Sequence, residues 1–215
     1  MPLVQLLYRC PRCGHDPTVG DKDEAACPEC GCTFRRGGPG GLISVSEPAG
    51  GKWDVPSHRL SAAVERWTEE ELDAPAVPDV PIHSSRALVR QSGKEAPVFF
   101  NGELMGFAEA MGESAPATLT LTSEYLALER APASGRGGLQ CAAPALRWPL
   151  LDIRAVQTSS SSLQFSPRSG GLVEFKFPED STLRWETLLR GTLRRAYRRA
   201  GLGEIVEFQP RIVTR

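Results

Sequence analysis

Two pairs of cysteines near the start of the chain constrain its fold more than any other feature. Cys10 and Cys13 form the first Cys-x-x-Cys pair, and Cys27 and Cys30 form the second after a spacer of 13 residues. Each pair lies in a near-repeat, "CPRCGH" and "CPECGC", in which proline restricts φ and glycine allows the positive φ of a tight turn. Two such turns can direct four thiolates at one ion, so the sequence predicts a structural Zn²⁺ site.

These turns resemble the zinc-ribbon family over about residues 8–36. The resemblance implies that each cysteine turn sits on a short β-hairpin. An iron site of the rubredoxin type and a pair of disulfides are the alternatives. Four protein ligands fill a tetrahedral shell, so we do not expect catalysis at this metal. We expect the ion to replace the core that such a short segment cannot build.

Two further residues could take part in metal chemistry. His15 and Cys32 each follow a ligand by two residues and could be alternate ligands, although a surface imidazole and a spare thiol are the simpler interpretations. Cys141 stands alone in "LQCAAPAL", where we expect a packing role.

Changes in composition divide the 215 residues into four segments. The glycines of "RRGGPGG" indicate a flexible tether after the ribbon, and "SHRLSAAVERW" has the spacing of a short amphipathic helix beginning near Ser57. The predicted segments are a zinc ribbon (1–36), a flexible linker (37–56), a short helix with a Pro-rich connector (57–81) and a β domain with a C-terminal helix (82–215).

The β domain is predicted from short apolar runs separated by turn residues. Asn101-Gly102 lies between two such runs and indicates a hairpin, as does "PRSGG" between "SLQFS" and "LVEFKF". From Ser181 the period becomes helical, with one apolar stripe made of Trp185, Leu188, Leu189, Leu193 and Ala196. Ser181 is the expected N-cap and Gly201 the expected stop, and "EIVEFQPRIV" is expected as a final strand or docked tail. The predicted fold class is mostly β with α, a small barrel or sandwich capped by the helix.

The blocks "TLTLTSEYLALE", "RWPLLDIRAV" and "LVEFKFPEDSTLRWETLLRGTLRRAY" resemble, in this order, strands and the closing helix of the pleckstrin-homology-like superfamily, including its GRAM branch. The resemblance spans about residues 84–200. It implies a PH-like domain of the kind that binds partner proteins or phosphoinositides. The residues before Pro97 do not fit the glycine-rich first strand of that family.

The charge distribution separates an acidic middle from a basic end. Residues 51–130 hold 7 Lys/Arg against 13 Asp/Glu, whereas residues 182–215 hold 8 Arg against 3 Glu. A face of guanidinium groups on the last helix could bind phosphate, and a solvated basic face is the simpler interpretation. The candidate anion-binding residues are Arg190, Arg194, Arg195, Arg198 and Arg199.

Nothing in the sequence indicates an enzyme. None of the three histidines lies in a nucleophile motif, no phosphate-binding or dinucleotide motif is present, and Glu179-Asp180 is placed to favour a helix start. We therefore expect a non-enzymatic zinc-ribbon adaptor whose PH-like domain binds a partner protein or an acidic membrane surface. The alternative is a nucleic-acid-binding zinc protein that uses the ribbon and the arginine-rich helix. Paired cysteines without a signal peptide predict a cytoplasmic protein, with attachment to the inner membrane face in the lipid-binding version.

Overall fold

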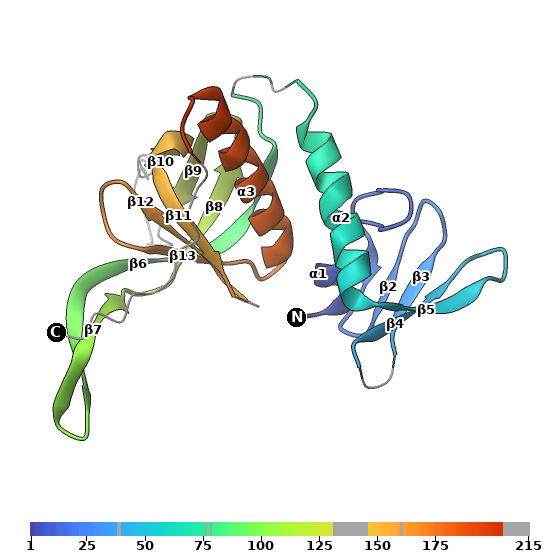
Figure 1. The fold of residues 1–215 in the computed structure, drawn as a ribbon, viewed down its shortest axis with the longest axis horizontal. Coiled ribbons are helices and arrows are strands. Elements are labelled where there is room, and N and C mark those ends of the chain that lie inside the picture. Colours follow the sequence, from blue (N-terminus) through green and yellow to red (C-terminus); the bar gives the residue numbers. More distant parts are fainter. Residues whose placement is uncertain (38–39, 76, 78, 131–145, 160, 204–215) are drawn as a thin grey trace, which may run out of the picture. The chain divides into compact units, whose positions relative to one another are not determined.

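The computed structural model describes residues 1–37, 40–75, 77, 79–130, 146–159 and 161–203. The chain forms two compact units (Figure 1): Met1–Ala76 with Ser181–Gly191, here unit 1, and Val77–Asp180 with Thr192–Arg215, here unit 2. The fold is mostly β, as the short apolar runs and turn residues predicted, and the strands of both units pair antiparallel. No helix in the described part of the chain has the length and apolar character needed to cross a membrane.

Unit 1 is built on a five-stranded sheet in which each strand pairs with the next along the chain. The strands are β1 (Val19–Gly20), β2 (Glu24–Ala26), β3 (Thr33–Arg36), β4 (Leu42–Ser46) and β5 (Lys52–Pro56). Ala25, Phe34 and Val45 lie opposite one another on neighbouring strands, and all three are buried. One face of the sheet therefore forms the core of unit 1, together with the four-residue helix α1 (Leu3–Leu6).

The segment expected as a flexible linker, residues 37–56, contains β4 and β5, so that prediction is wrong. Just before β4, the Gly37 N–H donates to the Leu42 carbonyl at 2.8 Å. In β4 the alternate residues Ile43 and Val45 are buried and extend the core. Glycines permit a tight turn as readily as a flexible tether. Only the alternation of apolar residues after them indicates that a strand follows and that the glycines belong to a turn.

Helix α2 (Ser57–Leu72) confirms the short helix that was predicted to begin near Ser57. It starts directly after Pro56 and buries Val64 and Thr68 on one face. It ends before the Pro-rich connector, of which residues 76 and 78 lie outside the described part. Proline lacks the N–H that a further helical turn would need.

Unit 2 contains a strongly bent sheet with the strand order β10-β9-β8-β6-β13-β12-β11, and β7 pairs with β6 beside this path. Its strands are β6 (His83–Phe100), β7 (Glu103–Met111), β8 (Ala115–Leu121), β9 (Tyr125–Arg130), β10 (Leu146–Pro149), β11 (Ile153–Thr158), β12 (Leu163–Pro167) and β13 (Val173–Lys176).

The two ends of this strand order are neighbours along the chain. Only the short 3₁₀ turn Leu150–Asp152 joins β10 to β11, so the sheet must fold back on itself. Trp148 of β10 meets Phe165 of β12 edge to face with ring centroids 5.0 Å apart, and Phe165 stacks on Phe175 of β13. The result is a sandwich-like arrangement rather than a closed barrel. The sequence had allowed both forms.

Both predicted hairpins are confirmed. Asn101 and Gly102, with φ of 50° and 83°, form the turn between β6 and β7, and β12 pairs with β13 across the "PRSGG" turn. Two positive φ values in succession are what a two-residue turn of type I′ requires, which explains the Asn-Gly pair.

Helix α3 (Thr182–Arg199) confirms the predicted closing helix. The Ser181 hydroxyl accepts the N–H of Arg184 at 3.2 Å, as an N-cap should, and Gly201 with φ 68° lies just after the helix end. The predicted stripe is buried in full: Trp185, Leu188, Leu189, Leu193 and Ala196. Cys141 and the tail from residue 204 to 215 lie outside the described residues.

Candidate metal centre

The two cysteine turns are built by the same set of backbone hydrogen bonds. In the first, the N–H of Cys10 donates to His15 O at 2.8 Å and the N–H of Gly14 donates to Cys10 O at 2.9 Å. The second repeats this pattern, with Cys27 donating to Cys32 O at 2.8 Å and Gly31 to Cys27 O at 3.0 Å. The two glycines have φ of 75° and 69°, which favours glycine over any other residue.

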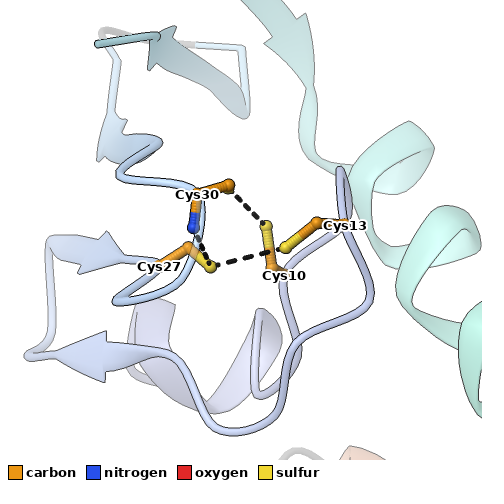
Figure 2. Close-up of side chains that lie close together, drawn as sticks. All are labelled: Cys10, Cys13, Cys27 and Cys30. Carbon is orange, nitrogen blue, oxygen red and sulfur yellow. Dashed lines mark hydrogen bonds between the residues drawn. The ribbon is translucent and has the colours of Figure 1, made fainter.

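These turns bring the four predicted ligands together. The sulfurs of Cys10, Cys13, Cys27 and Cys30 all lie within 4.8 Å of one another (Figure 2). The Sγ atoms of Cys10 and Cys30 are 3.7 Å apart, and those of Cys13 and Cys27 are 3.6 Å apart. Four sulfurs at about 2.3 Å from a tetrahedral ion would be separated by about 3.8 Å. The donor set therefore fits one tetrahedral metal ion.

The same distances separate this arrangement from a pair of disulfides. A disulfide needs sulfurs about 2.05 Å apart, and the closest pairs are much farther apart than that. All five described cysteines are free thiols. A tetrathiolate site of this shape accepts Zn²⁺, and it also accepts iron, so the geometry defines a metal site without choosing the ion.

The four thiols need a cation to carry four negative charges together. Burial raises the pKa of the Cys10 thiol, and partial desolvation raises the pKa of Cys13. Desolvation also acts on Cys30, but the Cys32 backbone N–H and hydrogen bonds from neighbouring thiols outweigh it and lower its pKa to about 7. A bound metal ion would supply the missing positive charge and release the remaining protons.

His15 and Cys32, the two alternate ligands considered, lie outside the group of four. Each instead provides the backbone carbonyl that accepts the N–H of the first cysteine in its turn. The Cys32 side chain is fully buried, and its Sγ accepts a hydrogen bond from Arg12 at 3.5 Å. His15 and Cys32 therefore occupy equivalent positions, and each closes its turn by accepting the same backbone hydrogen bond.

Different elements cover the two turns. A Cβ added at Gly14 would lie 2.9 Å from Cδ2 and Cε3 of Trp67 on α2. A Cβ added at Gly31 would lie 2.7 Å from Cγ of Pro48, in the turn between β4 and β5. Side chains from later in unit 1 thus already cover the glycines of both turns.

A charge cluster around the largely buried Arg9 lies beside the first turn, and no sequence motif indicated it. Arg9, which directly precedes the first ligand, has an 11% exposed side chain and pairs with Asp16 at 3.5 Å and with Glu71 of α2. Asp16 also pairs with Arg184 in the first turn of α3. These partners stand 7, 62 and 168 positions apart, so no local pattern links them.

The candidate anion-binding arginines all lie on α3. Arg194, Arg198 and Arg199 are exposed, whereas Arg190 and Arg195 are half-buried. Arg190 pairs with Glu186 at 3.2 Å, and Arg199 donates to the Ser123 carbonyl at 3.2 Å. At least these two guanidinium groups have structural partners, and anion binding by the set stays a prediction.

Asp180, interpreted from sequence as a helix-start residue, has a specific partner. Its Oδ2 lies 2.7 Å from Nε2 of His83 at the beginning of β6, and both side chains are largely buried. The pair links the first strand of unit 2 to the segment that leads into α3, two residues before the helix begins. The 97 positions between them explain why the sequence did not reveal it.

Comparison with known proteins returned no match, neither to a family model nor to a curated sequence.

Proposed function

We propose that this chain is a non-enzymatic adaptor that carries a structural Zn²⁺ in unit 1 and binds a partner protein through unit 2. Zinc is the preferred ion because two Cys-Pro-x-Cys-Gly turns with a short spacer are typical of structural zinc. The role is structural because four thiolates leave no open position for a substrate.

A PH-like interpretation of unit 2 is supported by its strand order. Seven antiparallel strands follow the order β10-β9-β8-β6-β13-β12-β11, and a C-terminal helix follows the last of them along the chain. That order agrees with the blocks on which the resemblance rests. Domains of this kind are binding modules rather than enzymes, so the fold class agrees with an adaptor, although fold by itself does not establish function.

The observation that carries the proposal is the hairpin formed by the outer part of β6 with β7, here the β6–β7 arm (residues 92–111). Figure 1 shows it extending beyond the main sheet, and within the described residues β7 pairs only with β6. Between residues 96 and 108 the sequence "APVFFNGELMGFA" contains one charged residue, Glu103. Pro97 is exposed, and Leu104 is 49% exposed.

A two-stranded arm of this composition is unfavourable alone in water. Isolated hairpins are at best marginally stable, and a third strand or a packed face normally supports them. A partner protein can supply that apolar contact or a further strand. An acidic membrane fits the arm less well, because residues 92–111 carry one lysine against three glutamates. The partner class favoured is therefore a protein with an apolar groove or an open sheet edge.

The test uses the full chain, a variant with residues 94–109 replaced by an Asn-Gly turn, and a control with Arg194→Ser and Arg198→Ser. A protein captured with the full chain is purified and titrated against all three. We expect its affinity to fall on the order of tenfold or more in the arm variant and to stay unchanged in the control.

Unchanged affinity of the arm variant would contradict the proposal. Binding to anionic vesicles that the arginine control abolishes would replace it with membrane attachment. Binding to nucleic acid that weakens steeply with salt would replace it with the nucleic-acid function. Metal analysis of the purified protein tests the zinc assignment, for which we expect about one equivalent of zinc in wild type and almost none in Cys10→Ser.

A further inference from the structure

The two metal-binding turns have unequal support from the sheet. The second turn lies between β2, which ends at Ala26, and β3, which begins at Thr33, and these two strands pair with each other. The first turn lies between the short helix α1 and the two-residue strand β1. Only the second turn therefore sits on a β-hairpin, whereas the zinc-ribbon resemblance implied a hairpin under both.

Helix α2 provides the support that the first turn lacks. The Trp67 indole N–H donates to the Pro11 carbonyl inside the turn at 3.2 Å, and its ring covers Gly14. Arg9 Nη1 donates to the Trp67 carbonyl, also at 3.2 Å. These contacts reach the chain on both sides of the first ligand, Cys10.

Two further contacts extend this interface before the first ligand. The Tyr8 hydroxyl and the Thr68 hydroxyl are 2.8 Å apart in a buried hydrogen bond. Arg9 also forms its ion pair with Glu71, one helical turn after Trp67. The residues of α2 that contact this part of the chain are thus Trp67, Thr68 and Glu71, with Glu71 one turn after the two others.

Among the described residues, the second turn is covered by a loop and not by a helix. Its glycine is covered by Pro48, which lies between β4 and β5. Glu47 beside that proline pairs with Arg12 of the first turn, whose side chain is 51% exposed, so this contact does not support the second turn itself. Its register is set by the β2–β3 pairing, in which Ala26 lies opposite Thr33. A change in α2 should therefore affect the first turn and leave the second in place.

We infer that Trp67 and Arg9 are positioning residues of the metal site, and that docking of α2 on the first turn and metal binding are thermodynamically linked. Helix docking holds two of the four thiols in place and so reduces the ordering cost of binding. Linkage is reciprocal, so the metal must stabilise the docked helix by the same factor. This inference rests on the metal site of the proposed function and goes beyond it by making α2 a metal-responsive element.

The test measures zinc affinity by competition with a chromophoric chelator in wild type, Trp67→Ala and Arg9→Met. Arg66→Ala is the matched control, since Arg66 is an exposed residue of the same helix with only a 4.0 Å contact to Glu70. We expect the two positioning variants to bind zinc on the order of tenfold more weakly, as residues that support metal ligands generally do. The control should stay within about twofold of wild type.

Hydrogen exchange provides the second readout and needs no variant. After chelation of the metal from the wild-type chain, the amides of Val64–Leu72 should exchange at least about tenfold faster, because the helix loses the same coupling. If metal removal leaves the exchange protection of α2 unchanged, the inference is overturned. This experiment uses the wild-type chain, so it remains decisive even if a variant fails to fold. Unchanged zinc affinity in both positioning variants would overturn it as well. A wild-type chain that binds no zinc would instead remove the metal site itself.

Discussion

At the residue scale, Gly14 is constrained in the first metal-binding turn both by its backbone conformation and by its neighbour Trp67. Its φ of 75° is unfavourable for any side chain, and Trp67 occupies the space into which a Cβ would project. Gly50 offers a matched comparison, because its φ of 93° is also left-handed but no atom lies within 4 Å of an added Cβ. An alanine at Gly50 would show the cost of backbone strain alone, whereas an alanine at Gly14 would add the steric conflict with Trp67.

We expect Gly14→Ala to lower the free energy of unfolding of unit 1 by about 2–4 kcal/mol, against about 1–2 kcal/mol for Gly50→Ala. The difference reports the displacement of the Trp67 ring, which is too rigid to move away cheaply. Both values can be measured by urea denaturation of the zinc-loaded protein, with hydrogen exchange of the β2–β4 amides as the readout for unit 1. Equal losses in the two variants would mean that the ring does not pack on the turn.

Among the elements, three neighbouring strands of unit 2 are linked by one buried carboxylate. Glu174 of β13 pairs with Arg90 of β6 and accepts a hydrogen bond from Gln164 of β12 at 2.7 Å. Burial of Glu174 raises its pKa, but these two partners outweigh burial and leave the pKa below its ordinary value of 4.5. The carboxylate therefore stabilises the folded state in its charged form.

This sign sets the pH at which the stabilisation is lost. The contribution of Glu174 should be complete above about pH 4.5 and disappear as the pH falls through its lower folded value. At neutral pH we expect Glu174→Gln to cost about 1–3 kcal/mol, and the cost should shrink in acid. Denaturant unfolding near neutrality and at about pH 3.5 measures this. Asp152→Asn, which alters the exposed pair with Arg168, should change little at either pH.

The elements also show which local patterns predicted structure well. Asn101-Gly102 and the stripe of α3 were sufficient because a two-residue turn and a helical period are encoded within a few residues. Strands β4 and β5 were missed because the glycines before them were interpreted as a tether. The alternation that forms β4, with Ile43 and Val45 inward, is only five residues long.

At the scale of the whole molecule, we expect the two units to depend differently on a bound metal ion. The hydrophobic core of unit 1 is small and includes two of the ligands, Cys10 and Cys27. Unit 2 has its own buried side chains, among them Phe165 and Phe175. Small cores commonly need a metal to remain folded, whereas a sandwich of this size does not.

We therefore expect Cys10→Ser with Cys13→Ser, or chelation of the wild-type protein, to abolish exchange protection in β2–β5 and to leave β8, β12 and β13 protected. Proteolysis of the metal-free chain should cut within residues 1–76 first. Loss of protection throughout both units on metal removal would contradict this prediction. Full retention of the β2–β5 protection would show that the metal is dispensable for the fold.

The sequence by itself determined the four metal ligands and the turns that present them, because a Cys-Pro-x-Cys-Gly turn is made by contacts within six residues. It also determined the hairpins and the closing helix of unit 2. Only the tertiary structure decided what covers those turns. The contacts of Arg9, Trp67 and Asp16 join residues up to 168 positions apart, and their energy comes from burial and charge pairing that no local period encodes. The support of the metal site by α2 is therefore a property of packing, although every residue in it can be read in the chain.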